Sequence, residues 1–108
     1  MSYKVAAIGN FRKEAKRLIK KYPSLQKEIA ALGEQLSLYP ALGTPIGKGC
    51  YKIRLSIASK GQGKSGSARI ITHVCVSGTT VYLLSIYDKS AKANISDAEL
   101  KELLKYVP

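Results

Sequence analysis

Several residue types and patterns that would mark a particular class of protein are scarce in this sequence. There is no tryptophan and one phenylalanine, so aliphatic side chains must form most of the core. The two cysteines, Cys50 and Cys75, lie 25 positions apart and form no CxxC pair. With His73 as the single histidine, this spacing favours reduced, structural cysteines over a disulfide or a metal site. We therefore expect no bound metal.

Long apolar segments are also missing. No run approaches the roughly 18 residues that would cross a bilayer, and residues 1–8 are too short for a secretory signal. A chain of 108 residues fits one domain, here residues 1–108, which would bury roughly two-thirds of its unfolded surface. These absences predict a soluble, cytoplasmic protein with no membrane partner.

Acidic residues are missing from a long internal segment. None stands between Glu34 and Asp88. That segment carries six cations and the histidine, namely Lys48, Lys52, Arg54, Lys60, Lys64, Arg69 and His73. The whole chain has 18 Lys and Arg against seven Asp and Glu, a formal net charge of +11. Such self-repulsion opposes folding, so the charge is better explained by a polyanionic partner, and we expect RNA.

Hydrophobic periodicity predicts an α+β fold in the order strand, helix, helix, three strands, helix. We expect these elements over residues 3–8, 11–22, 25–36, 51–58, 68–76, 80–87 and 96–104. The short N-terminal strand leads into a helical hairpin, and the three later strands form an antiparallel meander before the C-terminal helix. Residues 40–49 are rich in Pro and Gly and are interpreted as a loop. Ser96 and Glu99 have the spacing of a capping box.

Alternation along the first two strands of the meander predicts which side chains share a side of the sheet. One antiparallel register groups the apolar positions Ile53, Leu55, Ile57, Ile70, Thr72 and Val74. The other side then carries Lys52, Arg54, Arg69 and His73. Four basic or titratable groups would therefore converge on one surface.

Residues 58–65 nearly match the phosphate-loop pattern of nucleotide-binding enzymes, with Ala58 in place of the first glycine. A phosphate loop needs a helix after it, because the helix N-terminus holds the phosphates. Here residues 67–74 have the pattern of a strand, so we expect no nucleotide cofactor. The segment is either a plain hairpin connection or one that also lets Lys60 and Lys64 clamp an RNA backbone. We favour the second interpretation.

Four segments together resemble a known family. They are Tyr51-Lys52-Ile53-Arg54, the Gly/Lys loop, Ser67-Ala68-Arg69-Ile70-Ile71 and the run from Tyr82 to Lys89. These segments resemble the RelE/HigB toxins of bacterial type II toxin-antitoxin systems, from about Phe11 to Leu104. The resemblance implies a RelE-like fold and an mRNA interferase of the bacterial cytoplasm. Such an enzyme is an endoribonuclease that enters the ribosomal A site, cuts mRNA and inhibits translation. Its partners would be mRNA, ribosomal RNA and a cognate antitoxin, without a cofactor.

Carried over residue by residue, the resemblance implies a catalytic set of Lys52, Arg54, Arg69 and Lys89. Some members have a tyrosine six residues after the last of these, but here that position is Ile95. Tyr87 or Tyr51 could take its place. The residues expected to contact RNA around the catalytic set are Lys60, Lys64, Tyr51, Tyr87 and His73.

The chemistry of RNA cleavage assigns roles to these residues. The 2′-OH must lose a proton, the phosphorane needs positive charge, and the leaving 5′-oxygen needs a proton. Because acids are distant, our hypothesis makes Lys52 the base, with Arg69 on the phosphorane and Arg54 and Lys89 orienting the backbone.

Other interpretations stay open. The strand cations could be a solvated edge that discourages aggregation, and His73 could be purely structural. The chain could also be a DNA gyrase inhibitor of the related ParE type, or an RNA-binding protein without catalysis.

Overall fold

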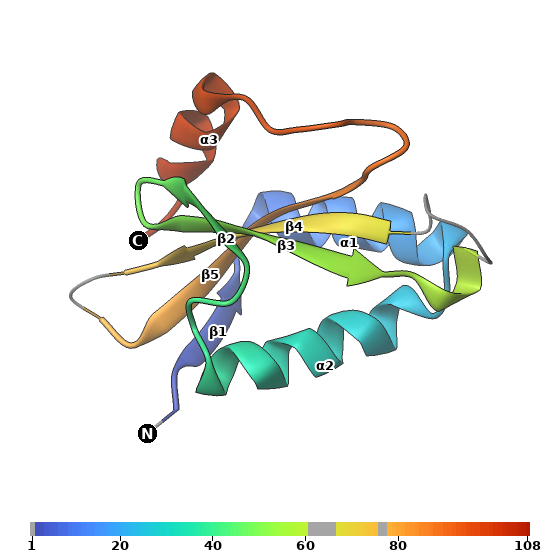
Figure 1. Ribbon diagram of the computed structural model, residues 1–108, viewed down its shortest axis with the longest axis horizontal. Coiled ribbons are helices and arrows are strands. Elements are labelled where there is room, and N and C mark those ends of the chain that lie inside the picture. Colours follow the sequence, from blue (N-terminus) through green and yellow to red (C-terminus); the bar gives the residue numbers. More distant parts are fainter. Residues whose placement is uncertain (1, 61–66, 76–77) are drawn as a thin grey trace.

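The structure, a computed structural model, describes residues 2–60, 67–75 and 78–108 (Figure 1). Its elements follow in chain order. They are β1 (Lys4–Ala7), α1 (Gly9–Lys21), α2 (Leu25–Leu38), β2 (Thr44–Gly47), β3 (Cys50–Ser56), the 3-10 helix η1 (Ala58–Lys60), β4 (Ser67–Val74), β5 (Thr80–Asp88) and α3 (Asp97–Leu104). The α+β class, the helical hairpin, the meander and the C-terminal helix are confirmed.

One expectation about the sheet is wrong. Residues 40–49 are not simply a loop, because β2 pairs antiparallel with β3 and makes the sheet five-stranded, in the order β1-β5-β4-β3-β2. Residue propensities do not predict β2, because neither Pro45 nor Gly47 favours a strand. At a sheet edge a proline is tolerated, because its missing N–H group would face solvent. The other edge strand, β1, runs parallel to β5, so the sheet is mixed.

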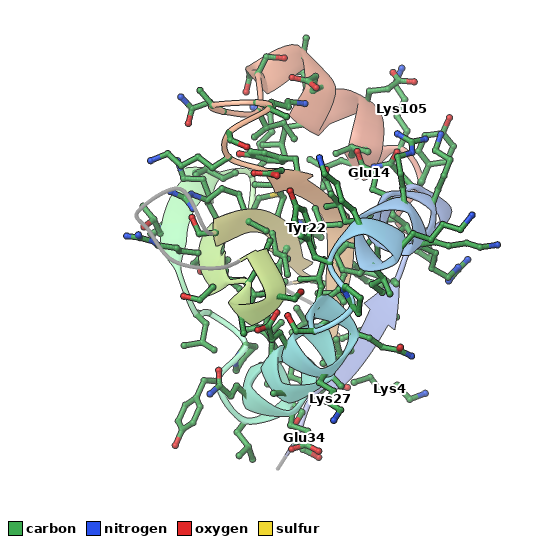
Figure 2. All side chains as sticks on the ribbon, turned by 90° about the vertical axis from the view of Figure 1, so that its right-hand side faces the viewer. Lys4, Glu14, Tyr22, Lys27, Glu34 and Lys105 are labelled. Atoms are coloured by element: carbon green, nitrogen blue, oxygen red, sulfur yellow. The ribbon has the colours of Figure 1, made fainter. Side chains whose placement is uncertain are left out.

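The helices cover different parts of this sheet. In Figure 1, α2 lies below the sheet and α3 above it, while α1 passes behind. Figure 2, turned by 90°, shows α1 beside the β1–β5 edge. Helix residues Phe11, Leu25 and Leu36 are buried together with the strand residues Ile53 and Ile70. One apolar core therefore holds the helical hairpin against the sheet.

α1 also completes an edge that β1 leaves open. β1 ends opposite Leu83, but β5 continues to Asp88. Beyond that point Asn10 Nδ2 donates to the Leu84 carbonyl at 3.1 Å. Glu14 Oε1 accepts from the Ile86 amide at 3.2 Å and from the Ser85 hydroxyl at 2.7 Å. Glu14 is labelled in Figure 2 on the side of α1 toward α3. It is the one acidic residue of this basic helix, and its carboxylate satisfies hydrogen-bond donors of β5.

The predicted register of β3 and β4 is confirmed. Ile53 pairs with Ile70 and Arg54 with Arg69. Residues directly opposite each other on antiparallel strands point to the same side. The side of Lys52, Arg54, Arg69 and His73 is called the cationic face below. The register prediction therefore positions these side chains correctly without any knowledge of β2.

The start of α3 is held by polar contacts. Glu99 N donates to Ser96 Oγ at 3.1 Å and Ser96 N donates to Glu99 Oε1 at 3.0 Å, so the predicted capping box is confirmed. Lys48, in the turn between β2 and β3, forms an ion pair with Asp97 at 3.1 Å. α3 is thereby fixed over the cationic-face side of the sheet. None of the helices in the described residues is long and apolar enough to span a membrane.

Candidate nucleic-acid interface

A row of three side chains crosses the cationic face at the end of the strands that is near η1. Arg54 on β3 pairs with Arg69 on β4, and Arg69 pairs with Tyr87 on β5. Cα atoms of directly opposite residues are about 4.5–5.5 Å apart. Two guanidinium groups that start so close, both reaching away from the same face, can contact one phosphate.

The two arginines differ in how they are held. Arg54 is exposed, whereas Arg69 is half-buried and its Nη1 donates to Ser67 Oγ at 3.0 Å and to the Ala68 carbonyl at 3.4 Å. Both acceptors are uncharged, so they hold the Arg69 side chain in place without neutralising its positive charge. Among the described residues Arg54 has no ion-pair partner, so its exposed side chain can follow a ligand.

Lys52 lies two residues before Arg54, on the same face of the same strand. Its Nζ donates to Asn94 Oδ1 at 3.3 Å. Lys52 also lines a hollow of about 240 Å³ together with Ile46, Asn94 and Leu100. The segment that leads into α3 therefore forms one wall of a recess beside the arginine pair.

No carboxylate neutralises this cluster within the described residues. The ion pairs at 4.0 Å or less involve Lys48, Lys92, Lys101 and Lys105, all of them with acids of α3. Lys52, Arg54 and Arg69 take part in none of them. Three uncompensated cations on one face make a site for an external anion.

Tyr87 closes the row, and its environment is unusual for a tyrosine. The residue is 6 % exposed, and its hydroxyl has no hydrogen-bond partner of acceptable geometry among the described residues. Burial raises the pKa of Tyr87 above its ordinary value, while Lys92, Arg69 and the nearby Ile95 backbone oppose the rise. The phenol is therefore protonated at neutral pH and can donate a hydrogen bond.

Lys92 was not anticipated from the sequence. Its Nζ lies 5.4 Å from the centre of the Tyr87 ring and also forms an ion pair with Glu99 Oε2. The residue stands in an irregular segment with no periodicity, so its position depends on the path of the chain between β5 and α3. Only its charge and its distance of five residues from Tyr87 could have drawn attention to it.

Lys89 follows directly after β5 and is exposed. Its backbone amide donates to the Ser67 carbonyl at 3.3 Å, which places it at the start of β4 near Arg69. Lys60 ends η1, and Lys64 lies outside the described residues.

Two residues expected to contact RNA do not join the row. Tyr51 pairs with Thr72 and lies on the side of Ile53, so β3 does not bring it to the cationic face with Lys52 and Arg54. The reason is strand alternation, which puts neighbouring residues on opposite sides.

His73 shares the cationic face but lies four residues from Arg69, roughly 13 Å along the strand. Its Nδ1 is 3.6 Å from the Sγ atom of Cys50, and burial raises the pKa of that thiol to about 11. This arrangement favours the structural role for His73. In the described part of the chain, no three His, Cys, Asp or Glu side chains gather as metal ligands.

Comparison with known proteins decides the family. The family model described as the RelE toxin of the RelE/RelB toxin-antitoxin system matches residues 10–107. This chain belongs to the RelE toxin family. It is thus a toxin of a toxin-antitoxin system, and the family implies a cognate antitoxin as its partner.

A solved structure agrees with the fold. A double arginine-to-alanine mutant of the E. coli toxin RelE in the free state superposes with a TM-score of 0.65 over 100 % of both chains, at 16 % sequence identity. At that identity the likeness to the E. coli RelE structure extends to the fold alone. The roles of individual RelE-family residues in this chain have to be argued from its own geometry.

Proposed function

We propose that this RelE-family chain is a ribosome-dependent endoribonuclease that cuts mRNA and so inhibits translation. The observation that carries the proposal is the cross-strand pair of Arg54 and Arg69, with Lys52 on the same face and no carboxylate beside them in the described residues. A phosphodiester placed over this pair would meet two guanidinium groups and an ammonium group.

Each step of the cleavage has a candidate among these residues. Lys52 takes the proton of the 2′-OH, and the 2′-oxygen attacks phosphorus. Arg69, held by Ser67 and the Ala68 carbonyl, stabilises the added charge of the phosphorane. Arg54 and Lys89, both exposed, orient the RNA backbone. The bond to the 5′-oxygen then breaks, leaving a 2′,3′-cyclic phosphate and a 5′-hydroxyl.

The leaving 5′-oxygen needs a proton donor, and Tyr87 fits this role. Its phenol is protonated at neutral pH and stands next to Arg69 across the strands. The hydroxyl is covered beside Ile95 in the free protein, so donation requires the segment after β5 to shift when RNA binds. Some family members have a tyrosine at the position that is Ile95 here. In this proposal Tyr87 has the role of that tyrosine.

A second candidate function is RNA binding without catalysis. The specific observation in its favour is the buried Tyr87 hydroxyl, which leaves no exposed proton donor in the row. In that case the cations would bind RNA and the phosphodiester would stay intact. The same assay separates the two functions.

The test uses translating ribosomes with a defined mRNA. Purified protein should produce new mRNA 5′ ends within codons that occupy the A site, and Arg69→Ala should remove them. Lys105→Ala is the matched control, because Lys105 is an exposed cation at the C-terminal end of α3 (Figure 2), paired with Glu102. Intact mRNA with the unchanged protein would exclude the nuclease and leave the binding function.

A second expectation is that ribosome-free mRNA is cut poorly, since the cationic face is open and depends on the ribosome to align the strand.

A further inference from the structure

A second cationic surface lies on α1, away from the cationic face. A shallow hollow of about 420 Å³ is formed by α1, the last residue of β1 and Gln26 near the start of α2. Its floor is apolar, because Phe11, Ala15, Ile19 and Ala7 line it. Phe11 and Ala15 are buried in the core, while Ile19 and Ala7 stay partly exposed. The hollow therefore offers apolar surface without an aromatic ring open to solvent.

The rim of this hollow is basic and regularly spaced. Arg12, Lys16 and Lys20 line it, and all three are exposed. Residues four apart on a helix lie on one side of it, so the three cations form a row along the hollow. Within the described residues no carboxylate lies within 4.0 Å of any of them. Glu14, the one acid of α1, bonds Ser85 and Ile86 instead.

An apolar floor with a basic rim is complementary to a helix with one apolar side and acidic residues beside it. We propose that the hollow binds an amphipathic, acidic helix of a protein partner, with apolar side chains on the floor and carboxylates opposite Arg12, Lys16 and Lys20. The inference concerns how a protein partner binds and does not depend on whether the chain cuts RNA. In a toxin-antitoxin pair the antitoxin is the natural source of such a helix.

RNA fits this hollow less well than a helix does. A single strand binds through phosphate contacts and through bases stacked on exposed aromatic rings. The only aromatic side chain of the lining, Phe11, is 3 % exposed. A charged phosphate backbone would not bury the apolar floor, whereas leucine side chains of a helix would bury it.

A designed peptide tests the proposal directly. The probe is a helical peptide of about four turns, with leucines three and four residues apart and glutamates beside them. A scrambled peptide of the same composition keeps the charge and loses the apolar side. The amphipathic peptide should bind at least about tenfold more tightly by fluorescence anisotropy, the factor that one buried leucine side chain can provide.

The chain offers a matched pair of double variants on one helix. Lys16→Glu with Lys20→Glu reverses two rim charges, while Lys13→Glu with Arg17→Glu reverses two exposed charges at the same spacing outside the hollow. The rim variant should weaken the amphipathic peptide about tenfold more than the second variant does. Equal losses in the two variants would show general charge attraction and overturn the proposal.

Amide NMR shifts of the unchanged protein locate the peptide. The proposal requires peptide-induced shifts at Ala7, Ile19 and Gln26. It is overturned if the peptide binds no better than its scrambled form, if it shifts only Arg54 and Arg69, or if a uridine oligonucleotide shifts the hollow more strongly. Because none of these readouts involves cleavage, a negative result here and a negative result in the ribosome assay are distinguishable.

Discussion

The cationic face and the α3 region handle charge in opposite ways. Around α3, Lys48, Lys92, Lys101 and Lys105 are each paired with Asp97, Glu99 or Glu102. On the cationic face, Lys52, Arg54 and Arg69 have only neutral partners or none among the described residues. Both regions are rich in lysine and arginine, so composition does not distinguish them. Cations that lack an acidic partner within the monomer, more than the number of cations, therefore indicate the surface that binds a polyanion.

Removing Arg69, the cation of the face that is held by hydrogen bonds, should reduce activity most. Arg69→Ala should lower ribosome-dependent mRNA cleavage about 100-fold or more, as loss of a preorganised group that stabilises charge usually does. Among the described residues the Arg69 guanidinium donates hydrogen bonds only to Ser67 and to the Ala68 carbonyl, so the melting temperature should hardly change. Primer extension on the mRNA and a thermal melt measure the two quantities. Full cleavage by the variant would remove Arg69 from the site.

The second prediction concerns Glu14, an acidic residue that stabilises the fold. Glu14→Ala would leave the Ile86 amide and the Ser85 hydroxyl without their acceptor. The free energy of unfolding should fall by about 2–3 kcal/mol, the cost of unsatisfied buried polar groups. Glu34→Ala, at an exposed position on α2 (Figure 2), is the control and should change it by less than about 0.5 kcal/mol. Urea unfolding measures both, and equal values would contradict the edge-completing role of Glu14.

Tyr87 lies where the two regions meet, between Arg69 and Lys92. Tyr87→Phe removes a hydroxyl that has no hydrogen-bond partner among the described residues, so stability should stay the same or rise by up to about 1 kcal/mol. Cleavage should fall by about tenfold or more, because the leaving oxygen loses its donor. Unchanged cleavage, measured on ribosomes with the same mRNA, would move the proton transfer to another group.

The smallest effect is the pH dependence of the α3 region. The Lys48 partner lowers the pKa of Asp97 below its usual 3.8, and Lys92 with the Ser96 amide lowers the pKa of Glu99 below its usual 4.5. A carboxyl with a lowered folded-state pKa stabilises the fold above its unfolded pKa, and this stabilisation is lost as the pH falls through the folded pKa.

Since both carboxyls are exposed, we expect only a small drop in melting temperature below about pH 4.5. Glu99→Gln should flatten the curve of melting temperature against pH. A variant that keeps the full slope would mean that other acids cause it.

Much of the fold follows from patterns that the sequence carries locally. Alternation from Tyr51 to Ile57 and from Ala68 to Val74 predicts both strands and the register that joins Arg54 to Arg69. The same alternation puts Tyr51 on the opposite side of the sheet from Arg54. β2 escaped prediction because its four residues, including Pro45, become a strand only through pairing with β3.

The remaining features depend on the path of the chain in space. The parallel pairing of β1 with β5 joins segments about 76 residues apart, and no local signal specifies it. The burial of Tyr87 and its contact with Lys92 result from how the segment between β5 and α3 crosses the sheet. Hydrophobic patterns do not report such irregular paths.

The most direct measurement of the central claim is the salt dependence of RNA binding to the cationic face. A 2′-O-methyl oligonucleotide, which cannot be cut, is bound by the unchanged protein, by Arg54→Ala with Arg69→Ala, and by Lys101→Ala with Lys105→Ala. Log affinity falls as log salt rises, and each lost phosphate contact to a single strand makes this slope less steep by about 0.7. We predict a slope less steep by about 1.4 for the double arginine variant and little change for the double variant of the α3 region. Equal slopes for all three proteins would contradict the account, because the uncompensated cations would then make no contact with RNA phosphates.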